Sequence, residues 1–446
     1  MRHGESRARL TAHFRYRSTQ IALAVLAMGI VIAIVLIQRN PQTQTPRASS
    51  PPPSEIPALA STPSPWPTPD TSKCRRATGI ASDGRRDTTT ALQTFLSAVP
   101  DRGCALLARG GLYRVDGTLQ LIDRHGVAIY GNGATLTTNV RGPLGTSAKG
   151  KGRSTRAMIQ VLRGNDVQIW GLTIDGPDSQ GTFESPYEEE AGIRVVGAVH
   201  VTIRDVHVRE VYGDAVSVYG YKHANTSTPS RGVVISALQA QVIGRQGVAM
   251  TGADGVTIED SDFDAIKRSV FDLEPLPRQA VKNVRLVRNN VGTYGNTFLA
   301  GGGYGPKDAV YVGFNRSSDP IRIKFFDGTR FTIEHNVGGG AARNPFVIAS
   351  GNDLRVVSNV QAFAGPGQVC PPDCGASGLE LTTTDHGSMC HALAEGNTFT
   401  GARALFRGTS PQSPCSWVDG GRNIIGGTVE APSSLKSKVH SSTKSR

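Results

Sequence analysis

The amino-acid sequence predicts an all-β solenoid, a rod in which short strands stack coil upon coil. One sequence motif repeats over residues 157–363: a glycine, alternating aliphatic residues, a polar pair, and then Asp or Asn. Examples are Gly164-Asn-Asp-Val-Gln-Ile-Trp-Gly-Leu-Thr-Ile-Asp175 and Gly252-Ala-Asp-Gly-Val-Thr-Ile-Glu-Asp260. One such unit cannot bury its apolar face without neighbours, so the repetition indicates a solenoid.

The spacing and the composition support this prediction. Ile203, Ile235 and Ile258 are 32 and 23 residues apart, and Leu286 follows 28 residues later. The 446 residues include 52 glycines, and 38% of the chain is hydrophobic. This composition suits many short strands joined by turns better than it suits long apolar helices.

The N-terminus predicts a membrane anchor. Residues 1–20 carry five arginines, and residues 21–37 form a 17-residue apolar run that is just long enough to cross a bilayer. The positive charge before the run predicts a cytoplasmic N-terminus and an exported, extracellular C-terminal part attached to the cell membrane by a single pass. The alternative is a cleaved signal peptide, but Gln38-Arg-Asn-Pro-Gln follows the run where small residues would mark a cleavage site.

The segments on either side of the folded part explain most of the basic charge. Residues 38–72 are rich in Pro, Ser and Thr and predict an extended linker, and residues 429–446 predict a disordered basic tail. Of the net charge of +12, residues 1–70 carry +4 and residues 433–446 carry +4, which leaves +4 for the rest. A nucleic-acid-binding protein would concentrate positive charge on its folded surface, so no nucleic-acid partner is expected.

The six cysteines all follow the apolar run and predict disulfides in an exported domain. Cys74 and Cys104 flank the start of the fold, and we expect them to pair. Cys370, Cys374, Cys390 and Cys415 cluster at the other end, where three pairings are open. A four-cysteine metal site is the alternative, but a second pair with the spacing of Cys370 and Cys374 is missing.

The folded part, expected over residues 73–428, begins with a short capping helix. Leu92, Phe95 and Leu96 share one helical face, and Asp87 precedes them as a candidate cap. Such a helix would cover the apolar core that the open end of a solenoid exposes.

Three motifs in this region resemble the opening of pectate lyase-like proteins, a superfamily related to the polygalacturonases. They are Asp83-Gly-Arg-Arg-Asp87-Thr, Gly111-Leu-Tyr-Arg-Val115 and Gly131-Asn-Gly-Ala-Thr-Leu136, although Arg86 stands where the family often has Asp. The resemblance covers about residues 77–425. It implies a right-handed parallel β-helix with three sheets per coil that cleaves or binds acidic polysaccharide, but fold alone selects no activity.

The repeats allow side chains of successive coils to be aligned. Residues 192–195, 215–218, 247–250 and 270–273 form equivalent strands. Because side chains alternate along a strand, one outer column should contain Arg194, Ser217, Ala249 and Asp272, and the next Val196, Tyr219, Thr251 and Glu274.

A polygalacturonase-like hydrolase site is incomplete in this sequence. Tyr212-Gly-Asp214-Ala-Val resembles the strand entry of those enzymes, but Ala215 replaces their second Asp. Hydrolysis needs carboxylates on both sides of the glycosidic bond. Arg322-Ile-Lys324 matches their substrate-binding triplet.

A lyase site is the preferred hypothesis. β-Elimination of a uronide needs a cation on the carboxylate and a base on the α-proton, and an Arg or Lys with a lowered pKa can be that base. The proposed catalytic residues are Asp214, Arg245, Arg268 and Asp272, and the proposed substrate-binding residues are Glu190, Arg194, Tyr219, Lys267, Glu274, Arg322 and Lys324. Asp214, Asp272 and Glu274 are candidate ligands for Ca²⁺. The alternative is a ladder of surface ion pairs with no catalytic role.

Two other patterns favour structural interpretations. Asp260-Ser-Asp262-Phe-Asp264 resembles the start of a Ca²⁺ loop, but Ala265 replaces the glycine that such a loop needs, so exposed strand residues explain it better. Asp205, Asp260, Asn289, Asn336 and Asn359 close successive repeats and are expected to bond to the backbone of turns.

The sequence therefore predicts a membrane-anchored extracellular β-helix that acts on an acidic polysaccharide or cell-wall glycan, as a lyase before a hydrolase. A non-catalytic glycan-binding protein and a purely structural surface protein are the alternatives.

Overall fold

A computed structural model describes residues 70–145, 152–223, 226–363, 377–384, 387–388, 390–408 and 415–425. They belong to one compact unit, Pro69–Arg446. The predicted membrane segment at 21–37, most of the linker, the tail at 429–446, and Cys370 and Cys374 lie outside the described residues. Within the described residues, no helix has the length and apolar character that a bilayer crossing requires.

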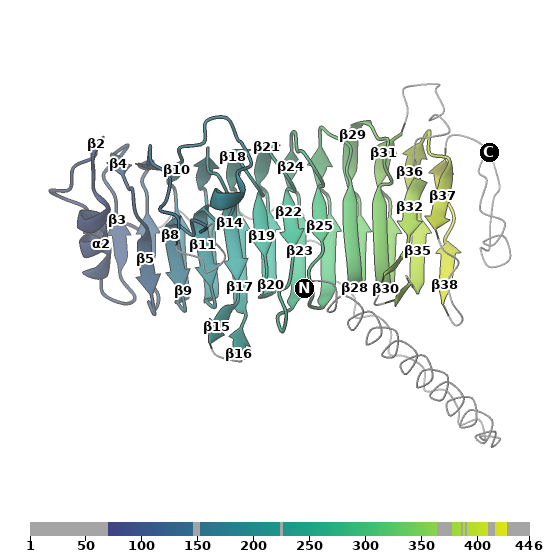
Figure 1. The fold of residues 1–446 in the computed structure, drawn as a ribbon, viewed down its shortest axis with the longest axis horizontal. Coiled ribbons are helices and arrows are strands. Elements are labelled where there is room, and N and C mark those ends of the chain that lie inside the picture. Colours follow the sequence, from purple (N-terminus) through teal and green to yellow (C-terminus); the bar gives the residue numbers. More distant parts are fainter. Residues whose placement is uncertain are drawn as a thin grey trace, which may run out of the picture. The chain divides into compact units, whose positions relative to one another are not determined.

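The described chain forms a parallel β-helix whose coils stack in one row, from α2 (Thr89–Ser97) to β38 (Ser416–Asp419) (Figure 1). Each coil has three sides, which we name the first, second and third faces in the order in which the chain passes through them. The first face is the side whose strands are given next. Strands confined to the first face are β5 (Leu119–Ile122), β8 (Ala157–Leu162), β11 (Ala191–Val196), β14 (Asp214–Tyr219), β19 (Val248–Met250), β22 (Phe271–Leu273), β25 (Leu299–Gly301), β32 (Ser377–Leu381) and β37 (Ala404–Gly408).

The second face follows after a turn and is the most regular. Its strands are β1 (Arg75–Arg76), β3 (Cys104–Leu106), β6 (Ala128–Tyr130), β9 (Asn165–Trp170), β12 (Val199–Arg204), β17 (Ser230–Ser236), β20 (Ala253–Glu259), β23 (Val281–Val287), β26 (Lys307–Gly313), β35 (His391–Glu395) and β38. β28 (Ile323–Glu334) and β30 (Val347–Val357) run through the turn and belong to both faces, so the first two faces form one sheet instead of the two that the resemblance implied.

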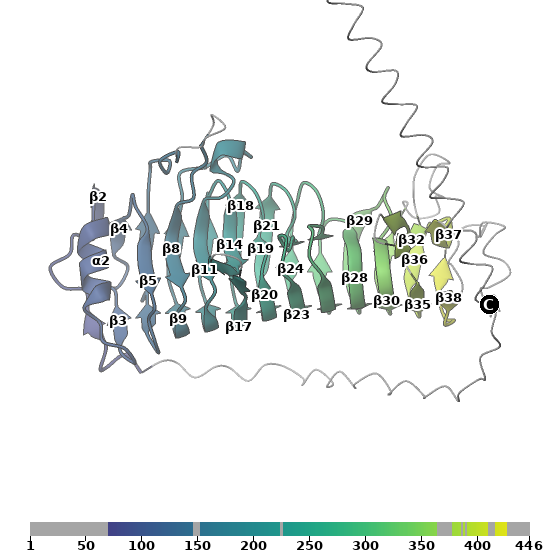
Figure 2. The same cartoon turned by 60° about the horizontal axis from the view of Figure 1, so that its bottom comes forward.

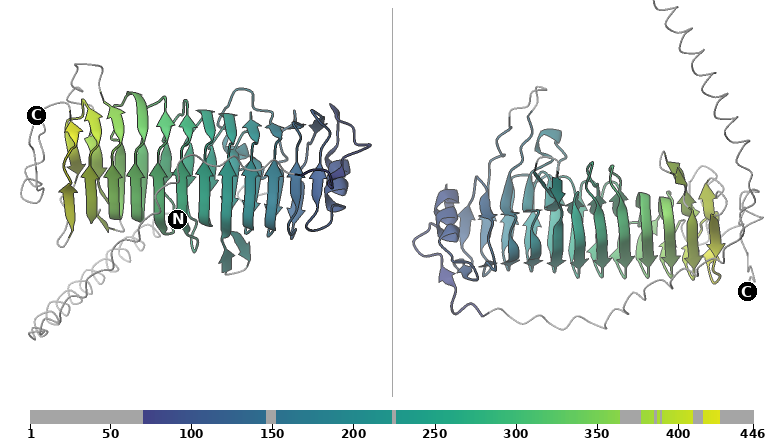
Figure 3. Two further views of the ribbon diagram at one scale, coloured as in Figure 1. Left: turned by 180° about the vertical axis from the view of Figure 1, so that it is seen from behind. Right: turned by 90° about the horizontal axis from the view of Figure 1, so that it is seen from below.

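The third face is a separate parallel sheet. Its strands are β2 (Asp83–Asp87), β4 (Leu112–Arg114), β7 (Thr135–Thr137), β10 (Thr173–Asp175), β13 (His207–Arg209), β18 (Gln239–Ile243), β21 (Asp262–Ile266), β24 (Asn290–Val291), β27 (Arg316–Ser317), β29 (Val337–Ala341), β31 (Val360–Ala362), β36 (Thr398–Thr400) and β39 (Ile424–Ile425). Two antiparallel hairpins stand outside the coils: β15 (Tyr221–His223) with β16 (Thr226–Thr228), seen from behind in Figure 3, and β33 (Thr383–Thr384) with β34 (Gly387–Ser388).

The predicted core register is confirmed. Ile203 pairs with Ile235, Ile235 with Ile258, and Ile258 with Leu286, and all four are fully buried. The irregular spacing of these residues reflects loops of different length between coils. The strands themselves keep one register.

The predicted cap and one predicted disulfide are also confirmed. Leu92, Phe95 and Leu96 are the buried residues of α2. Asp87 accepts a hydrogen bond from the Thr89 backbone at 2.9 Å, although Thr88 is the N-cap residue. Cys74 pairs with Cys104, and among the open pairings Cys390 bonds to Cys415.

A ladder of buried asparagines occupies the turn between the second and third faces. The Asn315 amide donates to Asn336 Oδ1 at 2.9 Å, and the Asn336 amide donates to Asn359 Oδ1 at 2.9 Å. The ladder begins at Asn289 and continues through Asn397 to Asn423. The prediction that this asparagine column is structural is confirmed.

Asp205 and Asp260 do not belong to this column, contrary to the alignment made from sequence. Asp262 pairs with Asn290, so Asp260 is equivalent to Arg288 and stands one position before the ladder. Asp260 has a positive φ of 50° and pairs with Arg288 at 2.8 Å.

Replacing a rung of the ladder should destabilise the protein strongly. In an Asn336→Ala variant the Val312 carbonyl and the backbone N–H of Asn315 would lose their buried partners. Each unsatisfied group costs about 1–3 kcal/mol, so we expect a loss of about 3 kcal/mol in the free energy of unfolding, measured by urea denaturation. Asn290→Ala is the control, because Asn290 is exposed on the adjacent strand and should cost less than about 1 kcal/mol. Equal losses in the two variants would contradict a structural role for the ladder.

Candidate functional site

The first outer column predicted for the first face is in register, and in the second column Val196 pairs with Tyr219. Arg194 pairs with Ser217, Ser217 with Ala249, and Ala249 with Asp272. These four side chains do not line an open surface, because each of them is buried, with at most 7% exposure. These side chains are buried, although an outer column was predicted, because the loops between the third and first faces fold over them.

Glu190 and Arg194 hold those loops in place. Glu190 accepts hydrogen bonds from Arg156 at 2.8 Å and from the backbone of Gly142 at 2.7 Å. Arg194 donates to the backbone carbonyls of Thr155 and Glu189. Both were predicted to contact substrate, but both are buried and committed to protein partners.

A second contact holds the short helix η1 (Ser185–Tyr187) close to the entry of β14 (Figure 2). The Arg141 guanidinium stacks on the ring of Tyr187 at 4.9 Å and on the ring of Tyr212 at 4.8 Å. Gly213 permits the close approach, because a Cβ atom there would lie 1.7 Å from the Glu190 carbonyl oxygen. The glycine before Asp214 is therefore required by packing.

Asp214 lies at the start of β14 and is completely buried. Its carboxyl accepts hydrogen bonds from Ser217 at 2.9 Å and from Arg245 at 3.2 Å. Burial raises the pKa of Asp214 to about 6, and the positive charge of Arg245 opposes a larger rise.

Arg245 connects three coils through carboxylates. Besides Asp214, its guanidinium lies 3.9 Å from Glu188 and 3.7 Å from Glu274. Burial acts to lower the pKa of Arg245, but the surrounding charges, led by that of Asp214, outweigh it and raise the pKa overall. The raised pKa keeps Arg245 positively charged, which argues against its predicted role as a base, and its charge stabilises neighbouring carboxylates.

Asp272 is the most perturbed acid of the group. It is 2% exposed, its Oδ2 accepts a hydrogen bond from the Gln246 amide, and its Oδ1 has no hydrogen-bond partner. Burial raises the pKa of Asp272 well above its ordinary value, the negative charge of Glu274 raises it further, and Arg245 opposes the rise. Asp272 therefore tends to hold a proton at pH values where exposed carboxyls are ionised.

Glu274 is the accessible carboxylate of the site. It follows Asp272 by two positions, just past the end of β22, and its negative charge acts on Asp272. The Glu274 side chain is 48% exposed. The site thus combines a buried carboxyl that favours its protonated form with a solvent-facing carboxyl beside it.

Tyr219 is partly buried next to Asp214 and Arg194. Burial raises the pKa of its phenol to about 12, helped by the charge of Asp214. The guanidinium of Arg194 lies 5.7 Å from its ring. Tyr219 therefore stays neutral and packs against the network.

The predicted basic residues lie further along the same side. Lys267, Arg268 and Lys324 are exposed, and Arg268 stacks on Phe183 at 4.9 Å. Lys324 is in register with Asp272, with Ala300 on the coil between them. Arg322 is half-buried and stacks on Tyr294 at 5.1 Å. Of these cations, Arg268 is close enough for its charge to act on Asp272.

The candidate Ca²⁺ ligands do not fit a metal site. In the part of the chain that the structure describes, no three or more His, Cys, Asp or Glu side chains are grouped so that they could hold a metal ion. Asp214 is committed to Ser217 and Arg245, and Asp272 favours its protonated form. We therefore assign no step to a metal ion.

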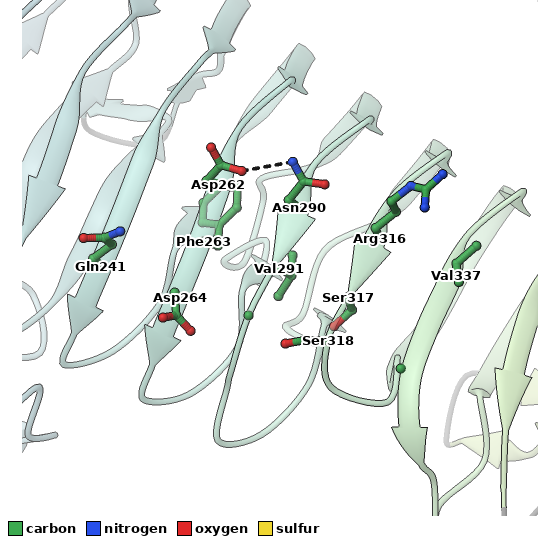
Figure 4. Close-up of a pocket in the computed structure, with 12 residues that line it drawn as sticks. Gln241, Asp262, Phe263, Asp264, Asn290, Val291, Arg316, Ser317, Ser318 and Val337 are labelled. Atoms are coloured by element: carbon green, nitrogen blue, oxygen red, sulfur yellow. Dashed lines mark hydrogen bonds between the residues drawn. The ribbon is translucent and has the colours of Figure 1, made fainter.

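The third face carries a shallow groove of about 480 Å³, away from these carboxyls (Figure 4). Its lining includes Asp262, Asp264 and Arg316. Asp262 accepts a hydrogen bond from Asn290 at 3.0 Å, and Asp264 accepts one from the Thr293 backbone at 2.8 Å. Both acids are exposed side chains on β21, so the interpretation of Asp260–Asp264 as strand and turn residues is confirmed.

Two contributors to the site were missed in the sequence. Ser217 bonds to Asp214, and Glu188 approaches Arg245. Ser217 was aligned in the outer column, but its bond to Asp214 at the start of the same strand was not foreseen. Glu188 lies in an insertion between coils, where the repeat gives no register and hence no signal.

No protein-family model and no curated protein sequence matches this chain. Solved structures do. The A-module of a mannuronan C-5 epimerase from Azotobacter vinelandii superposes with a TM-score of 0.57 at 16% identity and covers 79% of this chain and 96% of its own. The catalytic unit of an α-1,3-glucanase from Streptomyces thermodiastaticus gives 0.52 at 12% identity, covering 81% and 70%. The Dettilon tailspike protein gives 0.53 at 15% identity, covering 80% and 68%. These similarities confirm the pectate lyase-like β-helix fold.

The raised pKa values of Asp214 and Asp272 predict how stability depends on pH. In the native state these carboxyls bind protons up to a higher pH than in the unfolded chain, so their contribution to stability is lost as pH rises from about 4 through about 6 and above. An Asp272→Asn variant should match the wild type at pH 4. At pH 8 it should be more stable by at least about 1 kcal/mol, because each unit of pKa shift corresponds to about 1.4 kcal/mol. Urea denaturation at the two pH values measures this difference.

Asp264→Asn is the control with the opposite sign. Hydrogen bonding by Thr293 lowers the pKa of Asp264, so this carboxyl stabilises the protein at pH 8 and loses that effect as pH falls through its native pKa. The variant should therefore be less stable than the wild type at pH 8. An Asp272→Asn variant that is destabilised equally at pH 4 and pH 8 would contradict the raised pKa.

Proposed function

We propose that this chain cleaves an acidic polysaccharide that binds along the first face, with Asp272 and Glu274 as an acid–base pair. The observation that carries the proposal is the contrast between the two carboxyls. Asp272 is buried on β22 with a raised pKa, and Glu274 is exposed two positions further along the chain, just past the end of that strand. Neighbouring acids whose environments differ in this way commonly take the separate roles of proton donor and base.

The chemistry follows from that contrast. A protonated Asp272 can donate its proton to the glycosidic oxygen, and an ionised Glu274 can activate water or attack the sugar. Arg245 contributes by its charge, which limits the energetic cost of ionising the buried acid after the transfer. Asp272 Oδ1 is covered in the free protein, so the transfer requires a side chain to move when substrate binds.

Hydrolysis suits this arrangement better than the elimination predicted from the sequence. Removing a proton from carbon needs an unprotonated base, and the raised pKa of Arg245 favours its protonated form. Elimination with Lys267 or Arg268 as the base is the alternative lyase mechanism. It would give unsaturated products, and hydrolysis would give saturated ones.

The exposed cations support an acidic substrate. Lys267, Arg268 and Lys324 make no ion pair with another described residue, so their charges are available to carboxylates of the ligand. The neighbours also support a polysaccharide, because a glucanase and a mannuronan epimerase share this fold. Fold similarity at these identities does not select the sugar.

A non-catalytic glycan-binding protein is the second candidate. The burial of Asp214 and Asp272 favours it, because buried ion networks also serve to hold coils together. Such a protein would bind oligouronides and release no product.

We also propose that the β-helix is exported and anchored by residues 21–37. The disulfides Cys74–Cys104 and Cys390–Cys415 support export, because disulfides persist in oxidising compartments.

Substitution of either acid should remove activity. We expect Asp272→Asn and Glu274→Gln to lower kcat on a responsive uronide polymer by about 10²–10⁴-fold, the usual contribution of a general acid or base. The assay measures reducing ends and ultraviolet absorbance together, so hydrolysis and elimination are distinguished. Asp262→Asn, on the third face, is the matched control and should keep full activity. Wild-type turnover that survives Asp272→Asn and Glu274→Gln would refute the assignment, and binding without product would favour the second candidate.

A further inference from the structure

We propose that Tyr304 is a stacking platform for a sugar ring next to the one bound at Asp272 and Glu274. This inference rests on the proposed function and adds a binding residue to it. Tyr304 is 81% exposed, more than any other large hydrophobic side chain among the residues described. A ring so exposed gains nothing from the core, and aromatic rings placed in this way are typical of binding surfaces.

The ring is attached directly to the candidate site. Tyr304 lies in the turn between β25 and β26, and its backbone N–H donates to the Pro275 carbonyl at 2.8 Å. The N–H of Gly305 donates to the same oxygen at 3.1 Å. Pro275 follows Glu274 in the chain, so the tyrosine turn is bonded to the residue next to the accessible carboxylate.

A buried lysine side chain holds the turn by hydrogen bonds to its backbone. Lys307 is 1% exposed, and its Nζ donates to the carbonyls of Gly302 at 2.7 Å and Gly305 at 3.3 Å. Burial lowers the pKa of Lys307, which shows that the position costs free energy. The lysine bonds to carbonyls on both sides of Tyr304 and therefore holds the turn in one conformation.

Two glycines allow the turn to pack closely against the preceding coil. Gly303 has φ of +78°, and a Cβ atom there would lie 2.7 Å from the Pro275 oxygen. A Cβ atom at Gly305 would lie 1.9 Å from the Gln279 oxygen. The backbone that carries the ring is thus ordered by its hydrogen bonds and close packing, so little backbone entropy is lost when a ligand packs on the ring.

The location matches the axis along which a polysaccharide would lie. Ala300, which precedes this turn, pairs with Asp272 on the neighbouring coil. Coils are separated by about 4.8 Å, so the tyrosine lies about one coil beyond the acid–base pair. The exposed Leu276 widens the apolar surface beside it. The flat apolar face of a pyranose ring is the ligand that fits, and the cations nearby would take the carboxylate.

The test compares binding of galacturonate and mannuronate hexasaccharides to the full-length protein by calorimetry. Tyr304→Ala should raise Kd about 10-fold, the size expected for loss of an aromatic contact, and Tyr304→Phe should keep the wild-type value. Activity should show the same increase in KM, with kcat nearly unchanged, because stacking on a neighbouring sugar is equal in the ground and transition states. Phe314→Ala is the control, since Phe314 is an exposed ring that stacks on His335 on another side of the coil.

Lys307→Met tests the support for the ring. It should weaken binding to a similar extent, and a Tyr304→Ala, Lys307→Met double variant should be no weaker than Tyr304→Ala alone. If Lys307→Met does not fold, the two tyrosine variants decide the question. Wild-type affinity in Tyr304→Ala, in a protein whose activity depends on Asp272 and Glu274, overturns this inference alone. Failure of the wild type to bind either hexasaccharide overturns the proposed function with it.

Discussion

The structure depends on stacking in register between neighbouring coils. Backbone hydrogen bonds between parallel strands place each residue above its equivalent in the previous coil. Two columns follow directly: the aliphatic residues that fill the core, and the asparagines in the turn between the second and third faces. Asparagine suits a ladder because its side chain is donor and acceptor at once, so one rung can bond to the next indefinitely.

The two turns that flank the third face differ in regularity: the asparagine turn before it is regular, and the passage from the third face to the first is irregular. The asparagine turn keeps one geometry from Asn289 to Asn423 and leaves little room for variation. The passage from the third face to the first carries insertions such as the one that contains η1. Insertions there can approach one another without breaking the stack, and they bring Glu188 to Arg245 although the two residues are distant in sequence. This is why Glu188 and Arg245 meet at that edge.

Burial of charge is what distinguishes the site from an ordinary surface ladder of ion pairs. An exposed pair contributes about 0–1 kcal/mol and hardly changes a pKa. Asp214, Arg245 and Asp272 are covered by loops, so desolvation acts on each of them and the carboxyl pKa values rise. The stacked coils also bury Lys307, whose hydrogen bonds to two backbone carbonyls hold the turn of Tyr304 in place. A rigid repeat can bear these local costs because each coil is held by two neighbours.

The sequence by itself determined the repeat, the core column and the alignment of Arg194, Ser217, Ala249 and Asp272, because alternation along a strand is a local property. It placed Asp260 one position wrong, since a turn contains no alternation from which to count. Only the tertiary structure decided that the outer column is buried, that Cys390 pairs with Cys415, and that Tyr304 lies beside Glu274. Those contacts join loops that follow no repeat, so they depend on the three-dimensional path of each loop and leave no periodic trace in the chain.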